Sequence, residues 1–184
     1  MKDKFVFLDR DGVINRDSPE YVKRWSEFEF LPRSLNAIRL LTEHKCTVIV
    51  ITNQSILNRR MASLDDLEFT HSMMKKVVKE VGGEIKDIFF CPHAPEDGCS
   101  CRKPEPGLIF HARDKYGIDL GKSIMVGDSA KDIECAKKAG CRYAVLVKTG
   151  SYEQAIRTLE EQKILPDHVA GDLYEAVEWI IAHD

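Results

Sequence analysis

The sequence predicts an α/β protein whose parallel β-sheet is covered by helices on both faces. Short apolar runs alternate repeatedly with longer amphipathic segments, which is the pattern of successive βαβ units. The runs are apolar at consecutive positions rather than at every second one, as in Phe5–Leu8 and Thr47–Thr52. Strands of this kind are buried on both faces, which is typical of a parallel sheet.

The signals for helix ends support this division of the chain. In chain order we expect strands over residues 5–8, 47–52, 85–90, 123–127, 143–147 and 168–169, and helices over residues 34–41, 64–81, 106–116, 130–139, 152–162 and 173–182. Ser34 and Ser63 are candidate N-caps, because a hydroxyl oxygen can accept hydrogen bonds from the free N–H groups at a helix start. Pro106 suits a first helical turn, and Gly117 and Gly140 follow predicted helix ends.

Length and composition limit the possible classes of protein. The 184 residues suit a single domain over residues 1–184, and 43% hydrophobic with 31% charged residues is typical of a soluble globular protein. The net charge of −3 argues against nucleic-acid binding, which usually shows a basic stripe. No apolar run reaches the length of a membrane span, and Met1–Lys4 leads into a strand without signal-peptide features. We therefore expect a cytoplasmic monomer that binds neither membranes nor nucleic acid.

Two aspartates follow the first predicted strand. Asp9 and Asp11 are two residues apart, so we expect them on one face at the carboxyl end of the strand, where ligands bind in open α/β sheets. Gly12 permits a sharp exit from the strand. Two carboxylates this close repel each other unless a cation lies between them. An ordinary acidic turn is the alternative explanation. Binding of a metal ion together with a phosphate is the simplest function that would require such a pair of carboxylates.

Three later segments place further polar groups near predicted strand ends or in loops. Thr52–Gln54 ends the second strand, where a hydroxyl and turn amides can bind phosphate oxygens. Lys103 follows Arg102 in a loop, and a lysine beside paired carboxylates would offset their charge and hold a phosphoryl oxygen. Asp128 and Asp132 are four residues apart, so they meet on one side of a helical turn. Taken alone, each segment has an ordinary explanation, such as a solvated charge or an acidic first turn.

Six cysteines without an export signal indicate a reducing compartment, in which clustered cysteines more often bind metal than form disulfides. The cluster in this chain consists of Cys91, His93, Cys99 and Cys101. Three thiolates and one imidazole make a closed tetrahedral set, which is typical of a structural zinc site. A loop with free thiols is the alternative. Arg102 and Lys103 follow the last ligand directly, so a bound Zn²⁺ would fix the position of both side chains.

The four acidic, polar and basic segments occur in the order of the four motifs of the haloacid dehalogenase superfamily, and the chain resembles its aspartyl-phosphate phosphatases over nearly its whole length. The resemblance implies a Rossmann-like sheet, and no segment is long enough for a large cap domain. It implies four catalytic residues: the nucleophile Asp9, the general acid/base Asp11, the phosphate-binding hydroxyl of Thr52 and the charge clamp Lys103. It also implies a catalytic Mg²⁺ held by Asp9, the Asp11 carbonyl and Asp128, with Asp132 as a supporting carboxylate.

The cysteine loop narrows the resemblance to the D-glycero-D-manno-heptose 1,7-bisphosphate 7-phosphatases and the related histidinol-phosphate phosphatases. The segments Phe28–Pro32, Thr52–Ser55 and Cys101–Gly107 fit the heptose enzymes better, and the Asp-Gly-Leu-Gly of the histidinol branch is missing. One segment departs from the heptose pattern. Residues 56–60 read Ile-Leu-Asn-Arg-Arg where that family usually has Gly-Ile-Ala-Arg-Gly, so the backbone cannot freely follow the same path.

The resemblance implies a phosphatase that removes the 7-phosphate of a small phosphorylated heptose, in the synthesis of ADP- or GDP-heptose for lipopolysaccharide or another envelope glycan. Asn15 and Asn53 are candidate substrate contacts, and Arg59 and Arg102 are candidate phosphate ligands. Three alternatives stay open: another sugar-phosphate or histidinol-phosphate phosphatase, a DNA 3′-phosphatase with the same Thr-Asn-Gln element, and a non-enzymatic binding module stabilised by zinc. Hydrolysis of p-nitrophenyl phosphate with Mg²⁺ would distinguish an enzyme from a binding module.

Overall fold

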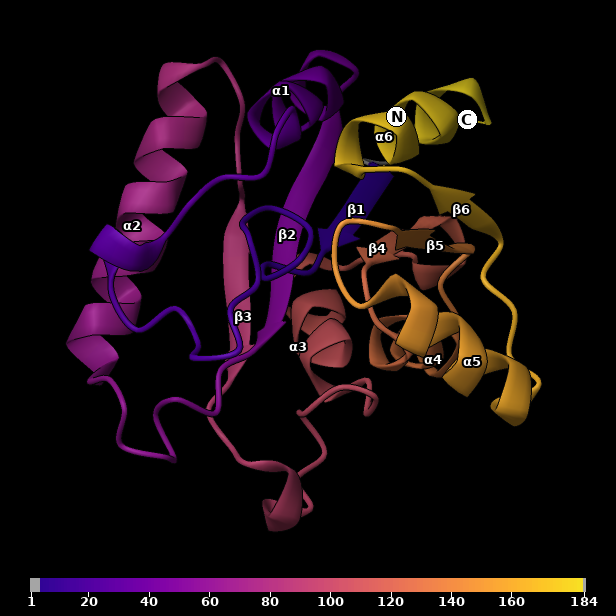
Figure 1. Ribbon diagram of the computed structural model, residues 1–184. Helices are drawn as coiled ribbons and strands as arrows, with labels where there is room; N and C mark the ends of the chain where they lie inside the picture. Colours follow the sequence, from indigo (N-terminus) through magenta and orange to yellow (C-terminus); the bar gives the residue numbers. More distant parts are fainter. Residues whose placement is uncertain (1–3, 184) are drawn as a thin grey trace.

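The structure is a computed structural model that describes residues 4–183, so Met1–Asp3 of the expected lead-in lie outside the described residues. Six parallel strands form one sheet in the order β3-β2-β1-β4-β5-β6 (Figure 1). The elements are β1 (Lys4–Leu8), α1 (Ser34–Glu43), β2 (Cys46–Asn53), α2 (Leu64–Glu80), β3 (Asp87–Cys91), α3 (Gly107–Tyr116), β4 (Ile124–Gly127), α4 (Ala130–Ala139), β5 (Tyr143–Val147), α5 (Tyr152–Gln162), β6 (His168–Ala170) and α6 (Leu173–Ala182). The predicted fold class is confirmed.

Helices cover both faces of the sheet, as the apolar runs predicted. Residues of α1, α2 and α6 form one core cluster with Val6 and Leu8 of β1. Residues of α3, α4 and α5 form a second cluster with Phe7. Alternate residues of β1 therefore enter opposite cores, and all three are fully buried. A strand with apolar residues at consecutive positions is what this two-sided burial requires.

The order of the strands reverses beside β1. From β1 the chain extends the sheet through β2 and β3 on one side, and through β4, β5 and β6 on the other. The carboxyl ends of β1 and β4 adjoin, because Leu8 pairs with Val126. Ligands bind at such reversal points in open α/β sheets. The turns that follow β1 and β4 carry Asp9 and Asp128, so the fold brings these two carboxylates to the same edge.

The two predicted helix caps differ in outcome. Ser63 caps α2: its Oγ accepts the Asp66 backbone N–H at 3.1 Å, and the Asp66 carboxylate accepts the Ser63 N–H. The prediction for Ser34 is wrong. Ser34 is the first residue of α1, and Arg33 occupies the cap position with a left-handed backbone (φ 64°). Among residues 4–183 the buried Ser34 Oγ has no hydrogen-bond partner.

The connections at the carboxyl edge of the sheet are loops without a large inserted domain, as expected. Residues 9–33 contain one short 3-10 helix, Trp25–Glu27, and residues 54–63 contain only turns. Trp25, Phe28 and Phe30 pack on one another with ring centroids 5.0–6.3 Å apart, and they also pack against the core on the α1, α2 and α6 side of the sheet, which anchors the longer loop. In the part of the chain that the structure describes, no helix has both the length and the apolar character needed to cross a membrane.

Candidate active site

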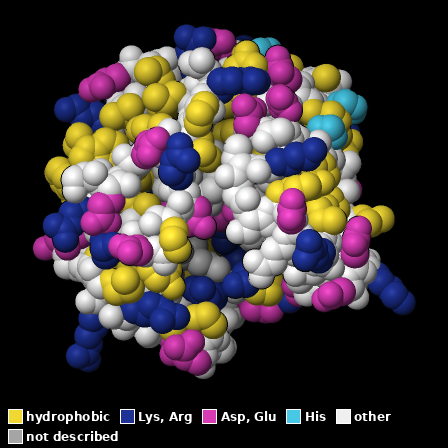
Figure 2. Space-filling view, viewed as in Figure 1, with side chains coloured by type: hydrophobic (Ala, Val, Ile, Leu, Met, Phe, Trp, Pro, Cys, Tyr) yellow, Lys and Arg dark blue, Asp and Glu magenta, His cyan; other side chains and the backbone are white. Residues whose placement is uncertain are grey.

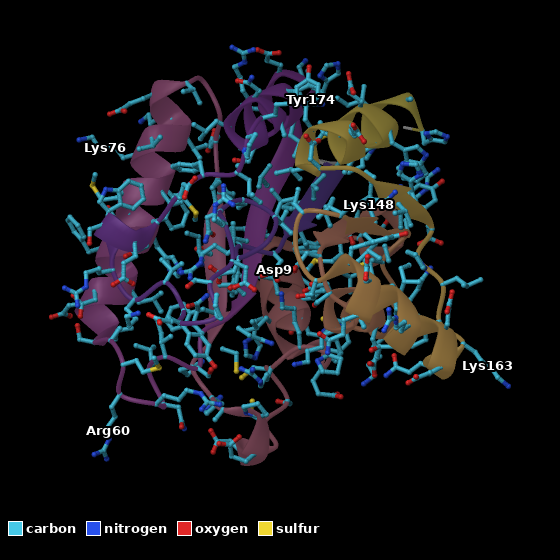
Figure 3. The ribbon with its side chains drawn as sticks, viewed as in Figure 1. Asp9, Arg60, Lys76, Lys148, Lys163 and Tyr174 are labelled. Carbon is cyan, nitrogen blue, oxygen red and sulfur yellow. The ribbon has the colours of Figure 1, made fainter. Side chains whose placement is uncertain are left out.

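A cleft of about 210 Å³ opens at the carboxyl edge of the sheet. The predicted site residues that line it are Asp9, Asp11, Thr52, Asn53, Arg102, Lys103 and Asp128. Figure 2 shows the molecule hollowed near the centre of this face, with Lys and Arg side chains along the lower margin of the hollow. In Figure 3 Asp9 lies at the centre of the same view. The four segments that the sequence analysis identified are far apart in the chain, and the fold brings them to one place.

Asp9 is held through one of its two carboxylate oxygens. Oδ1 accepts the Arg10 backbone N–H at 2.7 Å and the Lys103 ammonium at 2.9 Å. Oδ2 accepts no hydrogen bond from residues 4–183, so the side chain is oriented with one oxygen unoccupied. Burial raises the pKa of Asp9 well above its ordinary value; the Lys103 charge opposes this, and the carboxylates of Asp132 and Asp128 add to it. A further cation in the cleft would lower the pKa of Asp9 and favour its anion.

Lys103 is buried between two carboxylates. Its Nζ donates to Asp132 Oδ1 at 2.6 Å, to Asp9 Oδ1 at 2.9 Å and to the Ile51 carbonyl at 2.9 Å. These contacts use all three hydrogens of the ammonium group. Burial alone would lower the pKa of Lys103, but the carboxylates of Asp132 and Asp9 raise it above its ordinary value. Lys103 is therefore a permanent positive charge beside the Asp9 carboxylate.

Asp11 is surrounded by hydrogen-bond donors. Oδ1 accepts from Arg10 Nη2 and Asn15 Nδ2, both at 2.9 Å. Oδ2 accepts from Gln54 Nε2 at 2.8 Å and from Arg10 Nε at 3.2 Å. Burial would raise the pKa of Asp11, but the Arg10 charge and the hydrogen bonds from Arg10, Asn15 and Gln54 outweigh it and lower the pKa below its ordinary value. Asp9 and Asp11 thus have opposite electrostatic environments although they are two residues apart.

Asp128 fits into a space that only glycines leave open. Its Oδ2 accepts the Ser151 backbone N–H at 3.3 Å. A Cβ atom at Gly12 or at Gly150 would overlap the Asp128 carboxylate, so both positions require glycine. Burial, together with the Asp132 charge, raises the pKa of Asp128 to about 7. A buried carboxylate with so little compensation is suited to a metal cation.

Three carboxylates in the cleft fit a divalent cation. Asp9, Asp128 and Asp132 each offer an oxygen that lies within 4.8 Å of the others, and carboxylate oxygens are the ligands that Mg²⁺ prefers. Both oxygens of Asp132 are already engaged, Oδ1 by Lys103 and Oδ2 by the Ser129 hydroxyl, each at 2.6 Å. Asp9 and Asp128 are the two with oxygens left for an ion. The expected division into two direct carboxylate ligands and one supporting carboxylate is compatible with these contacts and stays a prediction.

Two predicted substrate contacts, Asn15 and Asn53, instead hold other site residues. Asn15 is fully buried, and its Nδ2 donates to Asp11 and to the next residue's carbonyl at 3.0 Å. Asn53 lines the cleft, but its amide pairs with the Lys103 backbone, donating to the C=O at 3.1 Å and accepting from the N–H at 3.0 Å. Asn15 has no exposed surface for a substrate hydroxyl, so it positions Asp11 instead. Asn53 positions the Lys103 backbone, and its contact with a substrate stays a prediction.

The predicted phosphate-binding arginines lie at different distances from the cleft. Arg102 lines it, and its Nη1 donates to the His93 carbonyl at 2.9 Å. Arg59 is exposed and is not a lining residue; its guanidinium lies 6.0 Å from the ring of Tyr21, which does line the cleft. Arg60 extends outward at the edge of the molecule, away from Asp9 (Figure 3). Arg102 is therefore the arginine of this set that reaches the site.

Eight residues that line the cleft were not among the predicted site residues: Arg10, Asp17, Tyr21, Val22, Gln54, Ser129, Lys131 and Ser151. Arg10 stands between two predicted catalytic aspartates, where strand alternation directs its side chain toward the interior. Gln54 and Lys131 belong to the segments that were identified, but no role followed from their residue types. Tyr21 has a left-handed backbone (φ 63°), which is uncommon for an aromatic residue. Nothing in the irregular loop predicts that conformation.

The predicted zinc ligands converge on one point. The three sulfurs are separated by 3.6 Å (Cys91–Cys99), 3.2 Å (Cys91–Cys101) and 3.4 Å (Cys99–Cys101). His93 Nδ1 lies 3.6 Å from the Cys91 sulfur and 3.3 Å from the Cys101 sulfur. A tetrahedral zinc with bonds of roughly 2.3 Å to sulfur separates its sulfurs by about 3.8 Å. The donor set fits a closed zinc site in both chemistry and arrangement.

Electrostatics also favour a cation among these thiols. Burial raises the pKa of the Cys91 thiol to about 12, and a hydrogen bond with Cys101 acts in the same direction. Three thiolates this close would repel one another strongly without a positive charge between them. Zn²⁺ supplies that charge and binds thiolates rather than thiols. The structure thus supports a site that can hold zinc.

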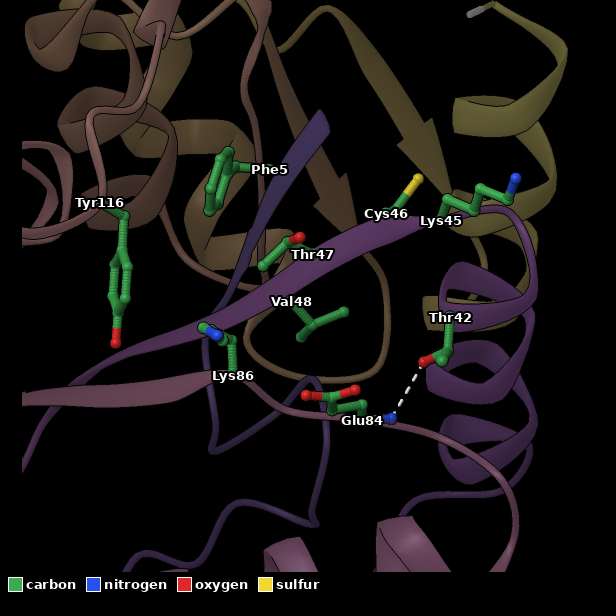
Figure 4. Close-up of a pocket in the computed structure, with 9 residues that line it drawn as sticks. All are labelled: Phe5, Thr42, Lys45, Cys46, Thr47, Val48, Glu84, Lys86 and Tyr116. Atoms are coloured by element: carbon green, nitrogen blue, oxygen red, sulfur yellow. Dashed lines mark hydrogen bonds between the residues drawn. The ribbon is translucent and has the colours of Figure 1, made fainter. Parts of the chain in front are cut away.

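A second hollow, of about 360 Å³, lies at the opposite edge of the sheet (Figure 4). It is lined by residues near the amino-terminal ends of β1, β2 and β3, among them Phe5, Thr47 and Lys86, and by Tyr116. On its rim the Glu84 backbone N–H donates to the Thr42 hydroxyl at 2.9 Å. None of the predicted site residues lines it. The chemistry of this chain is therefore concentrated in the cleft at the carboxyl edge.

Comparison with known proteins identifies the family of the chain. A family model described as HAD-hyrolase-like matches residues 100–176. The D-glycero-beta-D-manno-heptose-1,7-bisphosphate 7-phosphatase of Pseudomonas aeruginosa is 45% identical to the chain over 159 residues, which cover 86% of this chain and 87% of that protein. The chain belongs to the heptose-bisphosphate phosphatase family. The resemblance inferred from the motifs is confirmed.

Other members of the heptose-bisphosphate phosphatase family extend the match. The D-glycero-alpha-D-manno-heptose-1,7-bisphosphate 7-phosphatase of Photorhabdus laumondii is 38% identical, covering 81% of this chain and 85% of that protein. The crystal structure of D,D-heptose 1.7-bisphosphate phosphatase from B. bronchiseptica, complexed with magnesium and phosphate, superposes with a TM-score of 0.91 at 39% identity. That superposition covers 98% of this chain and 99% of the other. The similarity therefore includes the whole fold.

Removal of Asp128 should change the metal requirement. Asp128 is a predicted Mg²⁺ ligand, and Asp128→Ala would take its anionic oxygen away from a hard cation, so we expect the Mg²⁺ concentration for half-maximal activity to rise by about tenfold or more. A Mg²⁺ titration of p-nitrophenyl phosphate hydrolysis measures this. Asp65→Ala, at an exposed position of α2, is the matched control and should leave the titration unchanged. An unchanged requirement in Asp128→Ala would place the ion elsewhere.

Proposed function

We propose that this protein is a Mg²⁺-dependent phosphatase that removes the 7-phosphate of D-glycero-D-manno-heptose 1,7-bisphosphate by way of an aspartyl-phosphate on Asp9. One observation carries the proposal: Asp9 is oriented through Oδ1 by Lys103, while its Oδ2 is unoccupied in the cleft that Asp11 also lines. The named activities of its relatives supply the substrate. The product would be a heptose 1-phosphate, which can be activated with a nucleotide for lipopolysaccharide or another envelope glycan.

In the first half-reaction, Asp9 Oδ2 attacks the phosphorus of the 7-phosphate and the bond from phosphorus to the sugar oxygen breaks. The departing oxygen takes a proton from Asp11. The low pKa of Asp11 in the free protein does not prevent this, because a phosphate anion bound nearby raises the proton affinity of a carboxylate. The Thr52 hydroxyl accepts from Gln54 Nε2 at 2.9 Å, so its own hydrogen is available for a phosphoryl oxygen.

In the second half-reaction, Asp11 is an anion and takes a proton from the water that attacks the aspartyl-phosphate. The bond between Asp9 and phosphorus breaks, and inorganic phosphate leaves. The donors around Asp11 stabilise the anion that acts as the base. Mg²⁺, when bound by Asp9 and Asp128, would neutralise phosphoryl oxygens throughout. Lys103 adds a fixed positive charge beside Asp9, which offsets the repulsion between this carboxylate and the substrate.

Two basic side chains at the cleft are suited to the phosphate that is not cleaved. Arg102, which directly follows the cysteine loop, lines the cleft. Lys131, the second residue of α4, lines the same cleft as Asp128. A guanidinium can bind a phosphate through two parallel hydrogen bonds. A substrate with a phosphate at each end would thus have a separate charged partner for each phosphate, as the binding of a bisphosphate requires.

Within this proposal, we expect the β anomer of the heptose bisphosphate to be the preferred substrate. Three relatives with 44–45% identity carry the β-anomer name, whereas the α-anomer relative from Photorhabdus laumondii is 38% identical. Separate kcat/KM values for the two anomers of the bisphosphate would measure the preference. A larger value for the α anomer would contradict the assignment and leave the phosphatase chemistry intact.

Arg102→Ala tests the bisphosphate assignment. Loss of a charge-assisted contact worth roughly 1.5–3 kcal/mol should raise KM for the heptose bisphosphate by about 10- to 100-fold, and should change KM for a sugar monophosphate far less. Arg60→Ala is the matched control, because this arginine points away from the cleft. Steady-state kinetics of both variants with both substrates would decide. Equal effects of Arg102→Ala on the two substrates would remove Arg102 from recognition of the second phosphate.

The cysteine cluster is proposed to hold one structural Zn²⁺ that acts on the cleft through geometry. Four protein ligands leave no open position at which zinc could activate water. The loop that carries the ligands continues into Arg102, whose side chain is tied back to the His93 carbonyl at 2.9 Å. Asn53 then fixes the Lys103 backbone through its two hydrogen bonds. Zinc would therefore determine where both basic residues lie.

Cys99→Ser should lower turnover without changing the Mg²⁺ requirement. A displacement of positioned groups by about 1 Å can cost on the order of 100-fold in rate, and loss of a ligand loosens the loop that ends in Lys103. Metal analysis of the unmodified protein should find about one zinc per chain, as four ligands imply. Cys46→Ser, outside the cluster, is the control. Zinc-free protein with full activity and tolerance of Cys99→Ser would contradict a structural zinc site.

A further inference from the structure

A buried guanidinium connects the acid/base candidate with a helix outside the cleft. The Arg10 side chain is 1% exposed and points back to the neighbouring Asp11, to which Nε and Nη2 both donate. Its remaining nitrogen, Nη1, lies 3.2 Å from Nε2 of His71. His71 is a buried residue of α2, 61 positions away in the chain. Arg10 is thus fixed from two sides, by Asp11 and by His71.

The contact between Arg10 and His71 specifies the state of the imidazole. A guanidinium can only donate hydrogen bonds, so Nε2 of His71 must accept and the ring proton must be on Nδ1. Burial, reinforced by the Arg10 charge, lowers the pKa of His71 to about 3, which keeps the ring neutral. His71 therefore acts as a fixed acceptor that sets the plane of the Arg10 guanidinium.

The fixed guanidinium holds the Asp11 carboxylate from one side. Arg10 Nη2 donates to Oδ1 at 2.9 Å, and Arg10 Nε lies between the two oxygens, 3.3 Å from Oδ1 and 3.2 Å from Oδ2. Asn15 Nδ2 donates to Oδ1 at 2.9 Å, and Gln54 Nε2 donates to Oδ2 at 2.8 Å. Arg10 is therefore the donor that contacts both oxygens, and its position sets the plane of the carboxylate.

We propose that His71 is a positioning residue for the reaction: it acts through Arg10 to hold the Asp11 carboxylate in the orientation from which it gives and takes the proton. This inference rests on the proposed phosphatase function. Without the acceptor at position 71, Arg10 Nη1 is left unpaired in a buried site, a condition that costs free energy. The guanidinium then turns toward other acceptors, and Asp11 loses the contacts that set the plane of its carboxylate.

The test compares three substitutions at one position. His71→Leu removes the acceptor and keeps an apolar side chain, His71→Gln places an amide oxygen near the position of Nε2, and His71→Asn has an amide too short to reach Arg10. Thr70→Val is the control, since Thr70 is buried on the same helix and its hydroxyl donates only to the Asp66 carbonyl. For each variant, kcat and KM are measured with the heptose bisphosphate and with p-nitrophenyl phosphate.

A positioning role has a specific kinetic signature. His71→Leu and His71→Asn should lower kcat for the sugar phosphate by about 10- to 100-fold with little change in KM. The loss should be smaller for p-nitrophenyl phosphate, whose leaving group needs no proton. His71→Gln should recover most of the activity. Equal losses of kcat on both substrates would overturn the proposal. Equal kcat values of the His71→Gln and His71→Asn variants would also overturn it, and this comparison stays available if His71→Leu does not fold.

The wild-type protein separates this inference from the function on which it rests. Hydrolysis of p-nitrophenyl phosphate but not of the heptose bisphosphate would contradict the substrate assignment, and the His71 variants would then be compared on an alkyl phosphate that the wild type hydrolyses. Absence of all phosphatase activity in the wild type would contradict both. Activity on the bisphosphate with unaffected His71→Leu and His71→Asn variants would overturn the positioning role alone.

Discussion

Asp9→Asn is expected to abolish turnover while the protein stays folded. An amide cannot act as the nucleophile, and loss of a covalent nucleophile typically costs several orders of magnitude in rate, so kcat should fall by about 10⁴-fold or more. The folded state should persist because an asparagine Oδ1 can still accept from the Arg10 N–H and from Lys103. Steady-state kinetics and a thermal melt measure the two effects.

A trapping experiment identifies the residue that carries the phosphoryl group. Wild-type enzyme quenched in acid during turnover should yield a peptide that carries one phosphoryl group on Asp9, and the Asp9→Asn variant should yield none. The matched variant Asp17→Asn, in the same cleft, should still be labelled. Near-normal kcat in Asp9→Asn, or a phosphoryl group on another residue, would remove Asp9 from the mechanism.

Lys103→Met is expected to lower both activity and stability. Without the ammonium group, the carboxylates of Asp9 and Asp132 face each other uncompensated in a buried site. Breaking a buried ion pair by removing one partner costs about 3–5 kcal/mol. The charge that supports the phosphoryl group is also lost, which should lower kcat by about 10²- to 10³-fold. Denaturant unfolding and kinetics with saturating Mg²⁺ measure the two losses.

Lys138→Met is the matched control for this substitution. Lys138 also contacts two carboxylates, Glu105 at 2.7 Å and Glu134 at 2.9 Å, but it lies on the surface, where ion pairs contribute little. It should change neither stability nor activity appreciably. If Lys103→Met behaved like Lys138→Met, the charge of Lys103 would have no special role in the cleft.

The backbone of the site was predictable because strand periodicity and strand ends are local features. The apolar run Phe5–Leu8 predicted a doubly buried strand, and the same pattern located Thr52 at the carboxyl end of β2. In a parallel sheet all carboxyl ends lie at one edge, so residues that are distant in the chain were expected to meet there. The fold class and the place of the cleft followed from that rule alone.

The partners of each polar group were not predictable from the sequence. Asn15 and Asn53 were expected to contact the substrate, because a polar side chain near a strand end gives no indication of which atom it binds. The structure shows that Asn15 is used by Asp11 and Asn53 by the Lys103 backbone. Arg10 was missed because its role depends on His71, which a different helix supplies. Such contacts are set by tertiary packing, which local patterns do not encode.

Irregular loops account for the remaining differences. Arg59 was expected at the distal phosphate, and the loop over residues 54–63 places it near the ring of Tyr21, without making it a lining residue of the cleft. Tyr21 itself has a positive φ that no residue type in the loop required. The cysteine loop, in contrast, was predictable despite its irregular backbone. Its four side chains have the sequence spacing typical of ligands of one metal ion, and the structure brings them together.

The position of bond cleavage in the heptose bisphosphate tests the central claim most directly. The wild-type enzyme is incubated with D-glycero-β-D-manno-heptose 1,7-bisphosphate and Mg²⁺, and the reaction is followed by ³¹P NMR. We expect the signal of the 7-phosphate to be replaced by inorganic phosphate while the signal of the 1-phosphate remains. Release of the 1-phosphate first, or no release of phosphate with Mg²⁺ present, would contradict the proposed function.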